Sequence, residues 1–164
     1  MQDLFAPPGA AWRQVSPRLA TVRRLVLAAV ALLLLVAAVI LAVAVPDLPG
    51  WYLPVAVSAV CAACVVGWWW VGRVVQRWGY AERDEELWVT RGAMFRRLVV
   101  VPYGRMQFVD VQAGPVDQLV GIAAVHLHTA SPGTSAVIPG LEASEAARLR
   151  DRLTALGESW AAGL

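Results

Sequence analysis

The sequence lacks lysine and has little charge, cysteine or histidine. Its 14 basic residues are all arginine, its charged fraction is 16% and its hydrophobic fraction is 59%. Soluble domains average about 25% charged and about 45–50% apolar residues, so a plain soluble globule is not expected, and disordered and collagen-like classes are excluded. Two cysteines are too few for a disulfide scaffold. A net charge of +2 gives no argument for nucleic-acid binding, and we expect none.

Two long uncharged runs account for the excess of hydrophobic residues. Residues 25–45 are drawn only from Ala, Val, Leu and Ile, and residues 51–72 carry no charge. A helix needs about 20 apolar residues to cross the hydrocarbon core of a bilayer. The intervening residues 46–50 (PDLPG) allow only a tight turn. The sequence therefore predicts a membrane hairpin, with transmembrane helices at 25–45 and 51–72 and an extracytoplasmic turn at 46–50.

Two other interpretations of this region stay open. The tripeptide AVA at 42–44 fits a signal-peptide cleavage pattern, although the apolar run is longer than a usual signal core and 24 residues precede it. Cys61 and Cys64 have the C-x-x-C spacing of redox and zinc sites. Both thiols lie in the middle of a span among Ala and Val, however, where cysteine packs as a small hydrophobe.

Arginines flank the hairpin on both sides and avoid its turn, which carries Asp47. They lie before the first span and after the second, at Arg13, Arg18, Arg23, Arg24, Arg73, Arg77 and Arg83. Because basic residues are retained on the cytoplasmic side, we expect a multi-pass protein of a bacterial cell (inner) membrane with both termini cytoplasmic. Residues 1–24 are then a cytoplasmic N-terminal segment and residues 73–164 a cytoplasmic domain.

The region after the hairpin has the pattern of short strands. Residues 106–112 and 124–129 alternate apolar and polar side chains, which is typical of half-buried strands. Glycine, proline or charged turns separate the segments, at 82–86, Gly92, 114–115, 131–133 and 139–140.

The C-terminal region has a different pattern. Leucines at 149, 153 and 156 follow a possible N-cap at Ser144, so an amphipathic helix is expected, ending at Gly157. A run of strands closed by one helix indicates a small α+β or β-barrel domain with a C-terminal capping helix.

Five short motifs follow one another in this region in an order that is typical of a known family. They are VPYGRMQ at 101–107, QAGP at 112–115, LVG at 119–121, TAS at 129–131 and IPGL at 138–141. Together they resemble the bacterial pleckstrin-homology (PH) domains of the YdbS-like membrane proteins, over residues 78–156. The resemblance implies a PH-like fold with seven strands in two sheets and a capping helix, and it brings no catalytic residues. Met106 stands where the family usually has Ile, a change that a core tolerates.

The residues themselves indicate no catalytic, cofactor-binding or metal site. His126 and His128 lie two apart on a predicted strand, and therefore on one face, but both cysteines are in the membrane. Ser131 and Ser135 lack a nucleophile-elbow setting, and no phosphate-binding glycine loop is present. We therefore expect a protein that is not an enzyme.

Two turns suggest different relations to lipid. PH domains that hold inositol phosphates use basic residues at the first hairpin turn, whereas here that turn (82–86) has four acids, which argues against specific phosphoinositide binding. The turn near Gly92 is flanked by arginine and apolar side chains that could contact the inner leaflet of the bilayer; they are Arg91, Met94, Phe95, Arg96 and Arg97. The alternative is an arginine-rich hairpin tip in water.

These observations predict a membrane-anchored interaction module. The hairpin would tether a PH-like domain at the inner surface, where a sheet edge or a groove beside the terminal helix binds another membrane or cytoplasmic protein. The alternative is an accessory subunit of an envelope or transport complex, held through its hairpin, since small residues such as Ala56, Ala59, Ala62 and Ala63 favour close helix packing.

Overall fold

The computed structural model describes residues 9–130 and 135–161, which form two units. One unit is a helical hairpin, residues 20–73. The other combines the segment before Ala20 with the segment after Arg73. Each unit is described separately below.

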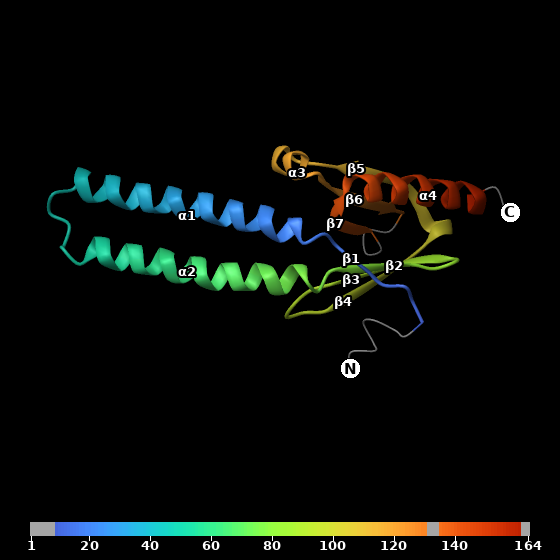
Figure 1. Ribbon diagram of the computed structural model, residues 1–164, viewed down its shortest axis with the longest axis horizontal. Helices are drawn as coiled ribbons and strands as arrows, with labels where there is room; N and C mark the ends of the chain where they lie inside the picture. The colour runs from blue at the N-terminus through green and yellow to red at the C-terminus, as the bar shows by residue number, and fades with distance from the viewer. Residues whose placement is uncertain (1–8, 131–134, 162–164) are drawn as a thin grey trace. The chain divides into compact units, whose positions relative to one another are not determined.

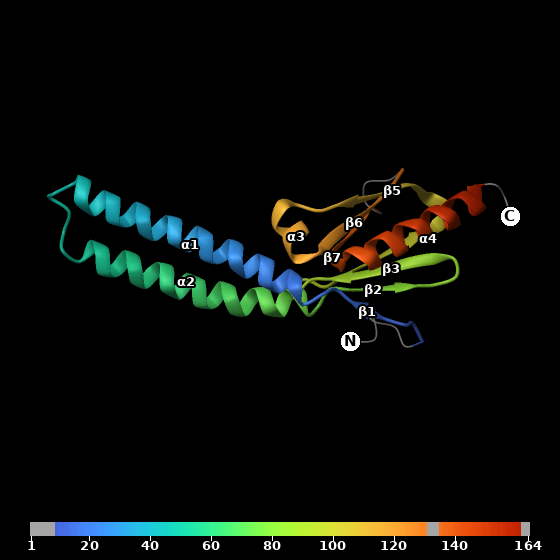
Figure 2. The same cartoon turned by 45° about the horizontal axis from the view of Figure 1, so that its top comes forward.

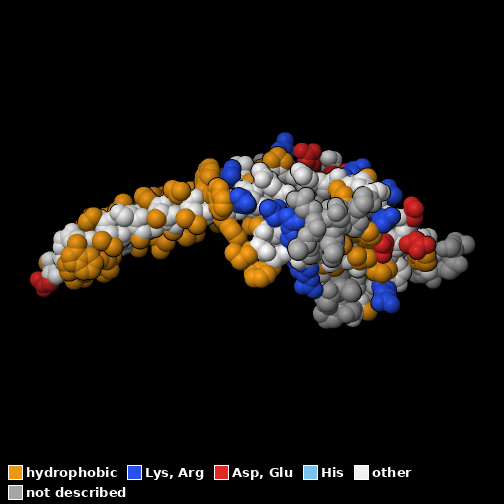
Figure 3. Space-filling view, turned by 90° about the horizontal axis from the view of Figure 1, so that it is seen from below, with side chains coloured by type: hydrophobic (Ala, Val, Ile, Leu, Met, Phe, Trp, Pro, Cys, Tyr) orange, Lys and Arg blue, Asp and Glu red, His pale blue; other side chains and the backbone are white. Residues whose placement is uncertain are grey.

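The hairpin consists of helix α1 (Arg18–Ala44) and helix α2 (Tyr52–Val75). Both helices are long and apolar enough to span a membrane, and hydrophobic side chains cover the length of the hairpin (Figure 3). The helices extend beyond the predicted spans because α1 begins at Arg18 and α2 ends at Val75. The spans are thus the apolar parts of longer helices.

Two arginine–tryptophan pairs mark one end of the hairpin. The Arg24 guanidinium lies 4.7 Å from the centre of the Trp68 ring, and the Arg73 guanidinium lies 4.5 Å from Trp69. Tryptophan and arginine concentrate where membrane helices meet the headgroups. The pairs therefore mark an interfacial level at the start of α1 and the end of α2.

In the second unit, the described residues form seven strands in two antiparallel sheets (Figures 1 and 2). The first sheet has the order β1 (Arg13–Gln14), β2 (Gly79–Glu82), β3 (Glu86–Arg91), β4 (Arg97–Pro102). The second has the order β5 (Met106–Gln112), β6 (Ile122–Thr129), β7 (Ala136–Glu142). Short helix α3 (Pro115–Val120) joins β5 to β6, and α4 (Ala143–Ala161) packs on β5, β6 and the 3-10 turn η1 (Tyr103–Arg105).

The core lies between the sheets and α4. Alternate residues of β3, β4 and β6 are buried, as a period of two requires, whereas β5 has no fully buried residue. Helix α4 adds side chains at a helical spacing, Ala146, Leu149 and Leu153, each with no exposed surface. The largest fully buried side chains are Tyr80, Tyr103, Leu87, Ile122, Leu127, Ile138, Leu149 and Leu153. This architecture confirms a PH-like domain after a membrane hairpin.

The segment before the hairpin is part of this domain. The sequence analysis treats residues 1–24 as a separate segment, but β1 pairs with β2 through Arg13↔Tyr80 and Gln14↔Gly79. The Ser16 amide donates to the Gly140 carbonyl at 2.8 Å, and Leu19 is 6% exposed. Residues on both sides of the hairpin therefore build one sheet. Burial of the apolar side chains near residue 19 against β7 holds the first of these segments in place.

Two element ends differ from expectation. Strand β7 continues through Pro139 and Gly140 to Glu142, because a register shift between Ala123 and Val125 of β6 accommodates the extra residue. Helix α4 continues through Gly157 to Ala161. Trp160 lies against Gly104 of η1, and this tertiary contact holds the last turn. The other expected elements between 79 and 130 are present, whereas the predicted turn at 131–133 lies outside the described residues.

Candidate functional site

The turn between β3 and β4 carries the five residues singled out as a membrane contact. Arg91 and Arg97 are direct cross-strand partners where the hairpin opens into its turn. Met94 and Phe95 form the tip and are 68% and 84% exposed. Like charges opposite one another on paired strands destabilise a sheet by a few tenths of a kcal/mol or more. The tip therefore holds exposed apolar groups beside a like-charged pair.

Among residues 9–130 and 135–161, the arginines near this turn have no anionic partner. Arg91 lies over the Trp78 ring at 6.0 Å. No ion pair or hydrogen bond joins the side chain of Arg77, Arg96 or Arg97 to another residue in the described ranges. Guanidinium groups without a carboxylate partner form a local positive field that attracts anions.

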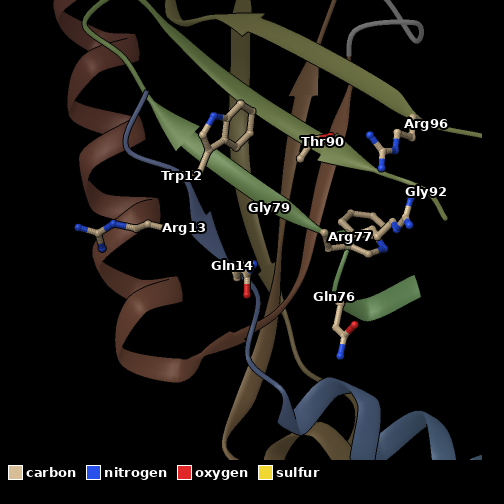
Figure 4. A pocket seen from close by; sticks show the side chains of 10 residues that line it. Trp12, Arg13, Gln14, Gln76, Arg77, Gly79, Thr90, Gly92 and Arg96 are labelled. Atoms are coloured by element: carbon tan, nitrogen blue, oxygen red, sulfur yellow. The ribbon is translucent and has the colours of Figure 1, made fainter. Parts of the chain in front are cut away.

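A groove of about 490 Å³ lies beside the turn (Figure 4). The segment that follows α2 contributes Gln76, Arg77 and Trp78, and the β3–β4 turn contributes Gly92 and Arg96. Further lining residues come from β1, the residue before it and β3; these are Gln14, Trp12 and Thr90. Arg13 also lines the rim, but its side chain points away from Arg96 toward α4, where it binds Glu145 (Figure 4). None of the described residues that line it is acidic.

The acidic residues of the first hairpin turn lie at the other end of β2 and β3. Glu82 is only 9% exposed and forms ion pairs with Arg148 and Arg152 of α4. Asp84 and Glu85 are exposed in the turn itself. The Tyr103 hydroxyl donates to the Arg83 carbonyl at 2.9 Å and holds the turn in place. The domain is therefore electrically polarised, with arginines at one end of these strands and carboxylates at the other.

Glu145 of α4 joins the two halves of this unit through three partners. It accepts hydrogen bonds from Arg148, from Arg13 at 2.8 Å and from the Tyr80 hydroxyl at 2.6 Å. The bond from Arg148 is the main cause that lowers the pKa of Glu145 to about 2. Burial, together with the bond to Glu145, raises the pKa of Tyr80 to about 12. This network ties β1 and β2 to α4 and is structural.

The lowered pKa of Glu145 predicts an acid-sensitive contribution to stability. A carboxyl group with a depressed pKa in the folded state stabilises the fold above its ordinary pKa of 4.5, and this contribution is lost as the pH falls toward about 2. We expect Glu145→Gln to lower the free energy of unfolding at pH 7 by about 1–3 kcal/mol. It should also flatten the loss of stability between pH 4.5 and 2. Thermal melts of the purified chain across this range measure both effects, and equal slopes in the two proteins would contradict the assignment.

The two histidines lie on one face of β6, as predicted. The His128 ring stacks on Phe108 with 4.2 Å between ring centres, and His126 is the cross-strand partner of Asp110. In the parts of the chain that the structure describes, no three His, Cys, Asp or Glu side chains come together to hold a metal. Cys61 and Cys64 are free thiols on α2. Of the two serines considered, Ser131 lies outside the described residues.

The groove is not predictable from the sequence pattern. Trp12 and Gln14 precede the hairpin and Arg77 follows it, so no local pattern connects them to Arg96. The available signal was the sequence RQV at 13–15, a short polar–apolar stretch beside the membrane that matches the edge of a strand. Such a signal is too short to assign without its partner strand.

The fold agrees with comparisons to known proteins. A sequence model of the bacterial PH domain matches residues 15–156, a range that begins directly after β1. The chain belongs to the bacterial PH domain family. It is also 37% identical, over 79 residues, to the UPF0699 transmembrane protein YdbS of Bacillus subtilis (strain 168). That alignment covers 48% of each protein, so the chain spans about half the length of the curated relative it matches.

No solved structure matches the chain. The family assignment and the two apolar helices together identify a membrane protein that carries a bacterial PH domain. The start of the family match at residue 15 agrees with the structural finding that the domain includes the segment before the hairpin.

Proposed function

We propose that this protein is a membrane-anchored, non-enzymatic interaction module that presents its bacterial PH domain at the cytoplasmic face of the inner membrane. The observation that carries the proposal is the pairing of β1, before the hairpin, with β2, after it. A sheet built from both sides of the hairpin requires both to lie on the same side of the bilayer. An even number of crossings satisfies this requirement, and two spans supply it.

Charge supports the cytoplasmic orientation. The arginine–tryptophan pairs at Arg24 and Arg73 lie at the end of the hairpin where the chain continues into the domain. The turn at the opposite end, residues 46–50, has Asp47 as its single charged residue. Basic residues near spans are retained in the cytoplasm. The domain then lies in the cytoplasm and the turn outside.

A groove between β5 and α4 supports a protein partner. It has a volume of about 320 Å³ and is lined by Met106, Phe108, Thr154, Gly157 and others. Strand β5 is the outer strand of its sheet, so one of its edges is available for a further strand. Extended peptides bind such edges through main-chain hydrogen bonds, and adjacent pockets accept their side chains. The groove and the edge together fit an extended segment of another protein.

Two matched variants on α4 test the groove in the full-length chain. Thr154 lines the groove, whereas the neighbouring Ala155 is exposed and does not line it. We expect Thr154→Arg to reduce co-purification of specific partners from mild detergent by about tenfold, since an obstructed centre of an interface costs at least about 1.4 kcal/mol. Ala155→Arg adds the same charge to the same helix and should retain the partners. Equal recovery with both variants would contradict a partner in this groove.

The alternative is an accessory subunit held in a larger complex through the hairpin. Ala56, Val60, Cys64 and Gly67 form the half-buried face of α2, and Gly67 lies against Leu27 of α1. Ala59, Ala62 and Ala63 are exposed on other faces. Small residues on a free face allow another helix to approach closely. Exchange of the hairpin for an unrelated one separates the two functions, because partners retained after the exchange bind the domain and partners lost bind the hairpin.

A further inference from the structure

The groove of about 490 Å³ beside the β3–β4 turn is positively charged, since the described residues that line it include arginines and no acidic residue. We propose that it binds the phosphate group of an anionic phospholipid, while Met94 and Phe95 reach past the headgroups. This inference rests on the proposed function, since the domain must lie at the bilayer surface. It names a ligand for a surface that is separate from the β5–α4 groove.

Arg77 and Arg96 are the residues that would hold the phosphate. They come from different parts of the chain, one just after α2 and one in the β3–β4 turn, and both are half-buried in the groove wall. Neither has an ion pair with a residue that the structure describes, whereas Arg13 on the same rim is bound to Glu145. Two partly desolvated guanidinium groups facing one groove repel each other, and an oxyanion relieves that repulsion through charge-assisted hydrogen bonds.

The neutral lining suits a headgroup as well as its phosphate. Thr90, Gln14 and Gln76 offer donors and acceptors for the hydroxyl groups of a glycerol headgroup. The Trp78 ring, which carries Arg91 over its face at 6.0 Å, is of the type that concentrates at membrane interfaces. Figure 4 shows side chains from the segment after α2 and from the turn facing the same space.

Chain connectivity sets the level of the groove. Arg77 follows the last residue of α2, Val75, by two positions, so it emerges from the membrane at the level of the headgroups. Strand pairing places the start of β2 beside the β3–β4 turn, because Gly79 pairs with Thr90 and the turn follows at Gly92. The acidic turn, at the far end of the same strands, leaves the basic end without competing carboxylates.

The tip supplies a second contact with the membrane surface, beside the groove. Phe95 is 84% exposed and Met94 is 68% exposed, next to Arg96 and Arg97. A combination of exposed apolar side chains and basic residues is the pattern that binds anionic leaflets. The apolar side chains would enter the interface while the arginines contact phosphates.

Native mass spectrometry of the full-length chain tests this proposal. The chain, purified in mild detergent, is titrated with phosphatidylglycerol or with phosphatidylcholine of the same acyl chains. We expect one saturable phosphatidylglycerol adduct, bound at least about tenfold more tightly than phosphatidylcholine. Arg77→Gln with Arg96→Gln should remove that preference and leave the melting temperature unchanged, because neither arginine forms an ion pair with any residue of the described ranges. Arg150→Gln, on α4 outside the groove, is the matched control and should keep it.

Three results would overturn the proposal. They are equal affinity for the two lipids, a preference that survives the double substitution, and glycerol 3-phosphate binding as tightly as the lipid in competition, which would assign the groove to a soluble phosphate compound. The titration is independent of the partner co-purification described above. If no specific protein partner co-purifies but the lipid preference is present, only the proposed interaction role is contradicted. If partners co-purify but the lipid preference is absent, only this inference is contradicted.

Discussion

Replacing Gly140 with alanine is expected to lower the free energy of unfolding of the domain by about 2–4 kcal/mol, the sum of backbone strain and overpacking. Gly140 has a φ of +67°, and a Cβ placed on it would lie 2.6 Å from the Cβ of Leu19. This neighbouring atom is the first side-chain carbon of a buried residue, so a change of rotamer cannot move it away. The melting temperature of the purified chain should fall by about 10 °C or more.

The same substitution also tests the link between the two sides of the hairpin. Gly140 accepts a hydrogen bond from the Ser16 amide, and Leu19 packs directly on it. Displacement of that segment should expose residues 15–19 to faster amide hydrogen exchange than in the unmodified chain. Gly157→Ala is a suitable control, because that glycine lies inside α4 with its nearest neighbour 4.0 Å away, and it should stabilise the helix by about 0.5–1 kcal/mol. A melting temperature for Gly140→Ala at or above that of the unmodified chain would contradict the packing described here.

Replacing Gly92 with alanine is expected to reorganise the β3–β4 turn. Its φ is +103°, and an added Cβ would lie 1.9 Å from the Phe95 carbonyl oxygen. No non-glycine residue fits that geometry, so the turn must change its path at a cost of about 2–4 kcal/mol. Met94 and Phe95 would leave their positions at the tip, and the Arg91↔Arg97 pairing would loosen.

The functional consequence separates the turn from the rest of the domain. If the turn and groove bind anionic lipid, Gly92→Ala should reduce the preference for phosphatidylglycerol by about tenfold, while Thr154-dependent partner binding at the β5–α4 groove is retained. Gly104→Ala, whose nearest neighbours lie 3.9 Å away, is the matched glycine control and should change neither property. An unchanged lipid preference in a chain whose turn has demonstrably moved would exclude a role for the tip.

Local patterns predicted much of this molecule. The uncharged runs predicted both apolar helices, because membrane spans are recognised by composition and length alone. Alternation predicted β5 at residues 106–112, the charged run marked the first hairpin turn, and Gly92 marked the second. Each of these features depends on neighbouring residues, and local chemistry is sufficient to specify it.

Other features depend on contacts between distant residues. Pro139 and Gly140 are locally typical of a strand end, but β7 continues through them because it has a bulge, with one residue more than β6 between the pairs Ala123↔Leu141 and Val125↔Ile138. Gly157 predicts a helix end, yet contact between Trp160 and Gly104 stabilises α4 beyond it. Glycine disfavours a helix by only about 1 kcal/mol relative to alanine, and the free energy of tertiary packing exceeds this helix propensity.

By itself, the sequence determined that this protein has two apolar spans, a domain rich in β-structure after them, and a basic, apolar turn near Gly92. The excess of hydrophobic residues belongs to the spans, since residues 25–72 contain only one charged residue. Tertiary structure alone decided that the segment before the hairpin joins the domain, and that Arg77 and Arg96 face one groove. The physical reason is that strand pairing and groove formation join residues from both sides of a hairpin of about 50 residues, and no periodicity within either segment encodes its partner.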